Sequence, residues 1–185
     1  MSLDHAILGF LNYHPYTGYD LKKIFDTSVR HFWPADQSQI YRTLTRLTEQ
    51  SYVEMEKVPQ DDRPDRKVYS ITEAGRAELI RWLAAAPPLE GPRSASLVQV
   101  FFAGQLSDDE VIAKFESVAA ILREVLDQYH KIPEQIVPYQ QEINSPREYF
   151  FWMLTLDNGI RNMRANLEWA ESVIAQFKAG KAPPN

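Results

Sequence analysis

Hydrogen-bonding side chains share one face of the stretch from residue 37 to about residue 50. At 100° of rotation per residue, they lie opposite the apolar positions Ile40, Leu44 and Leu47. The polar set is Ser38, Arg42, Thr45, Arg46 and Glu49, with Gln39 and Tyr41 at its flanks. Hydroxyl, amide and guanidinium groups hydrogen-bond base edges and phosphates in a DNA major groove. The same set also fits an ordinary solvated helix face, so the surrounding elements must decide.

Three basic residues follow in a polar loop between two stretches that are rich in Val, Tyr and Ile. Arg63 and Arg66 lie between strands predicted at residues 52–58 and 67–71, and Lys67 begins the second strand. Such a loop tip can reach an adjacent groove or the phosphate backbone. Its net contribution to DNA affinity is expected to be small, because three carboxylates share the loop. They are Asp61, Asp62 and Asp65.

Capping signals predict three helices before this loop and one after it. The first helix ends before Pro15, and the fourth runs from Thr72 to about residue 85. Two helices begin with a cap residue and a partner three positions later, namely Thr17 with Asp20 and Asp36 with Gln39. Three helices followed by a basic two-stranded hairpin form the winged helix-turn-helix arrangement. This order favours DNA binding over the plain solvated face.

A proline-rich break divides the chain. Three prolines fall within residues 87–92, which therefore cannot continue a helix and predict an extended connector. We expect a DNA-binding domain at 1–86, a linker at 87–92, a helical domain at 93–180 and a tail at 181–185. The predicted fold class is mainly α, with an amino-terminal winged helix-turn-helix and a carboxyl-terminal antiparallel helical dimerisation domain.

The helical domain carries a heptad pattern from residue 149 onward. Apolar residues recur there in alternating steps of four and three over a helix of about 32 residues, or about 48 Å. The predicted dimerisation residues are Tyr149, Met153, Leu156, Ile160, Met163, Leu167 and Ile174, interleaved with Ala170 and Phe177. A preceding helix at about 108–131 has matching spacing, so the two helices can pair within one chain. We expect this pairing and a homodimer.

Composition limits the other classes of function. The chain has 185 residues, 44% of them hydrophobic, a formal net charge of −5 and no cysteine. Disulfides, thiolate nucleophiles and cysteine-ligated metals are excluded. The four histidines are scattered without metal-ligand spacing, so we expect no metal, no cofactor and no catalysis. No apolar run approaches the length of a membrane span, and we expect a cytoplasmic protein without a membrane partner.

At three places the sequence resembles the PadR family of transcriptional regulators. The matching blocks are Leu8-Gly9-Phe10-Leu11 with Pro15 to Leu21, then Ser38 to Leu44 with Leu47, then Arg63 to Gly75. They cover most of residues 1–86 in the family's order. Residues 93–185 resemble the longer helical domain of one subgroup by pattern and length. Ser51 stands where the family usually has glycine, which we expect to tighten the turn and preserve the fold.

The resemblance implies a dimeric repressor whose two recognition helices enter successive major grooves of a pseudo-palindromic operator in double-stranded DNA. By this resemblance, the residues on the DNA-facing helix are Ser38, Gln39, Tyr41 and Arg42. The matching wing residues are Arg66 and Lys67, and Tyr19 matches a residue that contacts phosphate. Tyr41 has an equally good alternative, packing against the first helices. Gly18 and Gly75 are expected to be close-packing positions. Since the net charge is acidic, a winged-helix protein-interaction module without DNA binding remains the alternative function.

Some members of this family sense flat aromatic compounds. The resemblance therefore implies a small-molecule effector for this chain. Two aromatic clusters, predicted at the starts of carboxyl-terminal helices, offer residues for a pocket between the domains. The clusters comprise Phe101, Phe102, Tyr149, Phe150, Phe151 and Trp152, of which Phe102, Tyr149 and Trp152 are the candidate effector residues. A plain hydrophobic core is the alternative interpretation of both clusters.

Overall fold

The computed structural model describes residues 2–30, 32–59, 66–86 and 94–183. Arg63 and the linker predicted at 87–92 lie outside them. The chain divides into two compact units. The first takes in residues up to 87 together with 141–144, and the second takes in the remainder.

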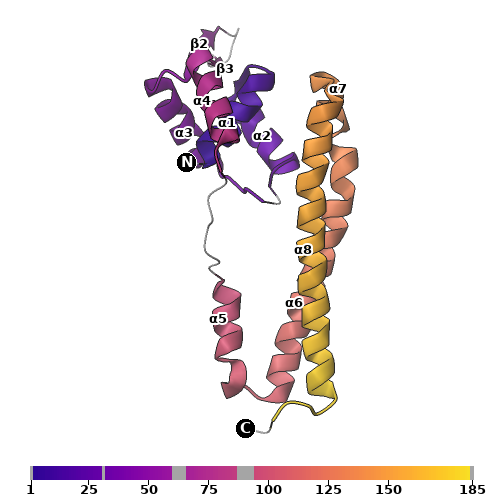
Figure 1. The fold of residues 1–185 in the computed structure, drawn as a ribbon. Coiled ribbons are helices and arrows are strands. Elements are labelled where there is room, and N and C mark those ends of the chain that lie inside the picture. The colour runs from indigo at the N-terminus through magenta and orange to yellow at the C-terminus, as the bar shows by residue number, and fades with distance from the viewer. Residues whose placement is uncertain (1, 31, 60–65, 87–93, 184–185) are drawn as a thin grey trace. The chain divides into compact units, whose positions relative to one another are not determined.

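The first unit contains four helices and a small sheet (Figure 1). Its helices are α1 (Ser2–Tyr13), α2 (Gly18–Thr27), α3 (Gln37–Glu49) and α4 (Glu73–Ala84), and its strands are β1 (Tyr16–Thr17), β2 (Val53–Val58) and β3 (Arg66–Ile71). The strands pair antiparallel in the order β1-β3-β2. The predicted helices and hairpin are confirmed, but the sheet has a third strand. Two residues are too few to show an alternating pattern, so β1 could not be predicted from the sequence.

One core holds these elements together. Ile40, Leu44 and Leu47 of α3 are at most 1% exposed, as predicted from their spacing. They pack with apolar residues of α1 and α2, and with Tyr69 and Ile71 of β3. The same core therefore fixes the rotation of α3 about its axis and anchors the base of the hairpin.

The turn after α3 is closed by backbone bonds and one unusual dihedral angle. The Tyr52 N–H donates to the Leu47 carbonyl at 2.9 Å, and Ser51 adopts a φ of 60°. A residue with a side chain is strained in this left-handed region, where glycine is at ease. The chain tolerates the strain without losing the turn, which agrees with the expectation for Ser51.

The second unit contains helices α5 (Ala95–Phe101), α6 (Asp108–Gln135) and α8 (Pro146–Lys178), with a short 3-10 turn at Ala103–Gln105. Helix α7 (Val137–Ile143) begins in this unit, and its residues from 141 onward belong to the first. The long helices α6 and α8 run side by side (Figure 1). Val111, Phe115 and Ala119 of α6 form a buried cluster with Ala170 of α8. The predicted pairing of two helices within the chain is therefore confirmed.

This pairing uses part of the predicted heptad set. Leu156 is 4% exposed, and Leu167 and Ile174 pack against the α6–α8 cluster. Tyr149, Met153, Ile160 and Met163 are half-buried within the same chain. These positions thus serve contacts within one molecule, and their role between molecules stays a prediction.

The two aromatic clusters occupy different kinds of position. Tyr149 to Trp152 lie in the first turns of α8, as expected. The prediction for the other cluster was wrong, because Phe101 is the last residue of α5 and Phe102 is its C-cap. Capping by Ser94 starts α5 earlier than the aromatic pair suggested, since the Ser94 hydroxyl accepts a hydrogen bond from the Leu97 N–H.

Among the described helices, none combines the length and apolar character needed to cross a bilayer.

Two glycines within helices should respond oppositely to alanine. A Cβ on Gly75 would overlap the Tyr52 carbonyl oxygen and approach Ile71 Cγ1 at 2.9 Å, whereas a Cβ on Gly9 meets nothing within 4 Å. We expect Gly75→Ala to lower the free energy of unfolding by about 1–3 kcal/mol through overpacking. Gly9→Ala should raise it by about 0.5–1 kcal/mol through helix propensity. Urea unfolding of both variants measures the difference, and stabilisation by Gly75→Ala would contradict the packing at this site.

Candidate nucleic-acid interface

The outward face of α3 carries the predicted polar side chains. Ser38, Arg42 and Thr45 are exposed, while the opposite face of the helix is buried in the core. The helix therefore presents donors and acceptors from a rigidly packed support. Such a helix has the dimensions of a major-groove reader, since the groove of B-DNA admits one α-helix.

A capping box organises the start of this face. The Gln39 N–H donates to Asp36 Oδ1 at 2.7 Å, and the Asp36 N–H donates to Gln39 Oε1 at 3.0 Å. Ser38 Oγ donates to Asp36 Oδ1 at 2.7 Å. Hydrogen bonds from the Ser38 hydroxyl and then the Gln39 N–H hold the pKa of Asp36 below its ordinary value. Gln39 keeps its amide NH₂ as a donor, and Ser38 keeps acceptor lone pairs.

Arg42 and Thr45 form local bonds that leave groups for DNA. Arg42 Nε donates to the Ser38 carbonyl at 3.3 Å, which leaves both terminal guanidinium nitrogens to bind a guanine edge or a phosphate. Thr45 Oγ1 donates to the Tyr41 carbonyl at 3.1 Å and retains its methyl group and lone pairs. Both side chains thus lie on the exposed face, and their hydrogen bonds within the helix leave other donor and acceptor groups available.

Arg46 is held differently from Arg42. Its guanidinium pairs with Asp4 of α1, whose side chain is only 15% exposed. This ion pair joins two helices that are distant in sequence and orients the carboxyl-terminal half of α3. The structure therefore gives Arg46 a positioning contact, while its predicted role on DNA stays a prediction.

Tyr41 packs against α2, which is one of its two predicted roles, while its role on DNA stays a prediction. Its ring covers Gly18 at the start of α2, where a Cβ would lie 2.5 Å from Tyr41 Cε1. The side chain nevertheless remains 39% exposed. The close-packing role expected of Gly18 is confirmed, and Gly75 shows the same behaviour against Tyr52.

Two further predicted residues lie near the junction of α2 and β3. Tyr19 is 67% exposed at the second position of α2. Arg66 Nη2 lies 3.4 Å from Asp20 Oδ2, and Asp20 also accepts a hydrogen bond from Thr17 Oγ1 at 2.7 Å. The base of the wing is thereby tied to the amino-terminal end of α2 through Asp20.

The strand register reveals a wing residue that the sequence analysis missed. Lys57 of β2 lies directly opposite Lys67 of β3, and both side chains are exposed. Like charges opposite one another destabilise a strand pair, so these two lysines lower the stability of the wing. Only knowledge of the strand register singles out Lys57, since the sequence places it ten residues from Lys67.

The candidate effector residues do not assemble within one chain. Tyr149 and Trp152 pack edge to face at 6.5 Å in the first turns of α8. Phe102 follows α5, whose Val100 packs against the same buried cluster as Phe177, near the other end of α8. About 25 residues of helix, or about 38 Å at 1.5 Å per residue, separate these regions. Among the described residues, no group of three or more His, Asp or Glu side chains is placed to hold a metal ion.

Comparison with known proteins covers both units. A family model described as the Transcriptional regulator PadR-like family matches residues 7–81, and one described as Virulence activator alpha C-term matches residues 92–178. The chain is 34% identical over 184 residues to the probable transcriptional regulator Rv1176c of Mycobacterium tuberculosis, covering 94% of this chain and 96% of that protein. It is 28% identical over 180 residues to the negative transcriptional regulator PadR of Bacillus subtilis, covering 95% and 97%.

Solved structures share the whole architecture. Bacillus subtilis PadR in complex with operator DNA has a TM-score of 0.82 at 26% identity, over 96% of this chain and 99% of that one. Bacillus subtilis PadR in complex with p-coumaric acid has a TM-score of 0.76 at 25% identity, over 96% and 99%. The extent of these matches and the identity to the mycobacterial regulator establish that the chain belongs to the PadR-like family of transcriptional regulators.

Proposed function

We propose that the chain is a homodimeric repressor that binds a pseudo-palindromic operator in double-stranded DNA. The exposed polar face of α3, supported by the buried Ile40, Leu44 and Leu47, is the observation that carries the proposal. The exposed polar side chains of α3, among them Ser38, Gln39 and Arg42, read base edges, and the wing contacts phosphates. The Bacillus subtilis relative named a negative regulator and its structure with operator DNA support this function.

Dimerisation follows from apolar surface in the second unit. None of the residues of α5 is buried, and Val98 and Phe101 are 58% and 82% exposed. A seven-residue helix gains too little from its own hydrogen bonds to be stable without packing. A second copy that covers α5 supplies this packing. Two recognition helices about 34–36 Å apart would then fit successive major grooves.

An effector response completes the proposed function. The structure of Bacillus subtilis PadR with p-coumaric acid supports a small aromatic effector for this chain. Repression ends when the effector changes the separation or tilt of the two recognition helices. A small rotation suffices, because half-site spacing is a geometric requirement.

A protein-interaction module without DNA binding is the second candidate, favoured by the net charge of −5. The salt dependence of DNA affinity separates the two functions. Phosphate contacts make the association constant fall steeply with salt, whereas a protein partner imposes no such slope. Fluorescence anisotropy with DNA from upstream of the chain's own gene and with random DNA, at two salt concentrations, provides the test. Absence of binding at low salt to both DNAs would favour the interaction module.

Arg42→Ala should weaken specific DNA binding by about 1–3 kcal/mol, because the lost guanidinium reads a base edge. Its effect on random DNA should be smaller. Arg81→Ala is the matched control, since Arg81 is exposed on α4 and pairs with Glu78 within that helix. Anisotropy titrations measure both variants. Equal losses on operator and random DNA would remove Arg42 from the set that reads sequence.

Lys57→Ala should reduce the salt slope of DNA binding by about one, because one phosphate contact is lost. Unfolding of the free protein should become no easier, because the substitution also relieves the repulsion from Lys67. Lys131→Ala on α6 serves as the control for loss of one exposed positive charge. The paired titrations and urea unfolding curves check both halves of this expectation. An unchanged slope would place Lys57 away from DNA.

Phe101→Glu should convert the dimer to a monomer, since a carboxylate replaces an apolar side chain on the proposed interface. Light scattering measures the change as a halved mass. Ile80→Glu is the control, because Ile80 is 65% exposed but lies on α4 in the first unit. A dimer that survives Phe101→Glu would exclude α5 from the interface.

A further inference from the structure

Two arginines on the outward face of α3 differ in their partners. Arg46 Nη2 donates to Asp4 Oδ1 of α1, so its charge is balanced within the chain. Arg42 donates through Nε to the Ser38 carbonyl, and no carboxylate in the described part of the chain lies within ion-pair distance of it. The two arginines are four residues apart and are therefore neighbours on the helix surface. The positive charge of this face is thus concentrated at Arg42.

The ion pair between Asp4 and Arg46 is partly withdrawn from water on the side of the carboxylate. The side chain of Asp4 is 15% exposed, and that of Arg46 is 48% exposed. A carboxylate that has lost most of its water depends on its cation, because removal of the cation leaves a poorly solvated charge. Asp4 therefore retains Arg46 more firmly than a fully exposed carboxylate would.

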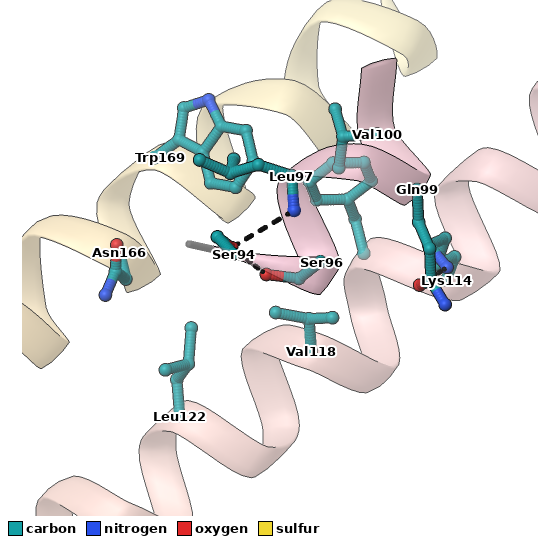
Figure 2. A pocket seen from close by; sticks show the side chains of 11 residues that line it. Ser94, Ser96, Leu97, Gln99, Val100, Lys114, Val118, Leu122, Asn166 and Trp169 are labelled. Atoms are coloured by element: carbon teal, nitrogen blue, oxygen red, sulfur yellow. Dashed lines mark hydrogen bonds between the residues drawn. The ribbon is translucent and has the colours of Figure 1, made fainter. Parts of the chain in front are cut away.

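The second unit offers two cations for comparison. Arg123 of α6 pairs with Glu171 of α8 at 2.5 Å, and this carboxylate is 48% exposed. Lys114 borders a pocket of about 420 Å³ between α5, α6 and α8, and it donates to a neutral amide oxygen, Gln99 Oε1, at 2.8 Å (Figure 2). Neutralising Glu171 thus frees a guanidinium group away from α3. Replacing Lys114 removes a positive charge without breaking any ion pair among the described residues.

We propose that Asp4 is a positioning residue that withholds Arg46 from the phosphate backbone and thereby raises the sequence specificity of DNA binding. The inference rests on the proposed function, since the outward face of α3 must meet DNA. Arg46 has to leave Asp4 in order to bind a phosphate. This exchanges one anionic partner for another, so the phosphate contact adds little to the affinity. Arg42 makes no such exchange.

The pairing acts on specificity because phosphates are the same in every sequence. An unpaired arginine strengthens binding to any DNA, whereas base contacts strengthen binding to the operator alone. In the operator complex, base contacts from α3 fix the pose, and Arg46 keeps Asp4. On random DNA no base contact fixes the pose, and a free guanidinium group would find a phosphate in many poses. Non-specific sites vastly outnumber operators, so the ratio of the two affinities determines occupancy.

The test compares Asp4→Asn with the native full chain on two DNA duplexes by fluorescence anisotropy. One duplex has a random sequence, and the other is the operator selected from random duplexes by repeated binding to the native chain. On the random duplex, the slope of log affinity against log salt should steepen by about 0.9 for each protomer, because the freed guanidinium group gains a phosphate contact. Affinity should rise about three- to ten-fold on random DNA and less than about two-fold on the operator.

Four further variants separate the freed arginine from the change in charge. Asp4→Glu keeps the carboxylate and should match the native chain on both duplexes. Glu171→Gln frees Arg123 in the second unit and should leave the salt slope unchanged. Asp4→Asn combined with Arg46→Ala should return the slope to the native value. Asp4→Asn combined with Lys114→Met has the same net charge as that double variant but keeps the freed arginine, so its slope should stay steep.

Arg46→Ala alone tests the same point in case Asp4→Asn does not fold, which urea unfolding establishes. Its salt slope on random DNA should equal that of the native chain, and a slope lower by about 0.9 for each protomer would overturn the inference. A native slope in a folded Asp4→Asn chain, or equal gains on both duplexes, would also overturn it. If the native chain shows no salt-dependent DNA binding, the proposed function fails together with the inference. Salt-dependent operator binding by the native chain, with the slope unaltered in Asp4→Asn, overturns the inference alone.

Discussion

Burial of one apolar stripe on α3 is the constraint on which the rest of the first unit depends. Ile40, Leu44 and Leu47 have no freedom to turn outward, because they fill the space between α1, α2 and β3. The opposite side of the helix must then face solvent. The polar side chains on that side of α3 are therefore held in a fixed orientation. Two further contacts hold α3 in the same rotation about its axis. Arg46 pairs with Asp4 of α1, and Tyr41 packs over Gly18 of α2.

Local signals in the sequence were sufficient for the elements that this constraint orders. The capping box of Asp36 and Gln39 and the spacing of the apolar stripe predicted where α3 begins and which face is buried, since both depend on neighbours within one or two turns. The blocks shared with the PadR family extended this prediction to the wing and to a regulator of transcription. The bounds of the strands were correct to within one residue.

What the sequence could not predict depends on contacts between distant segments. The pairing of Lys57 with Lys67 can be identified only from the strand register. The two-residue strand β1 forms through its hydrogen bonds to β3, a strand distant in sequence. The heptad pattern of α8 was equally consistent with a partner helix in the same chain or in a second copy. In the structure, α6 of the same chain packs against part of the heptad positions. The pocket beside Lys114 combines three helices, so no single segment contains its pattern.

The register of the wing also separates its charges by face. Glu54 and Glu56 alternate with Lys57 along β2, so the carboxylates project from one side of the ribbon and the lysine pair from the other. Arg66 precedes Lys67 and therefore projects on the carboxylate side. The two sides of the ribbon thus differ in charge: an approaching polyanion meets two paired ammonium groups on one side and a surface of mixed charge on the other.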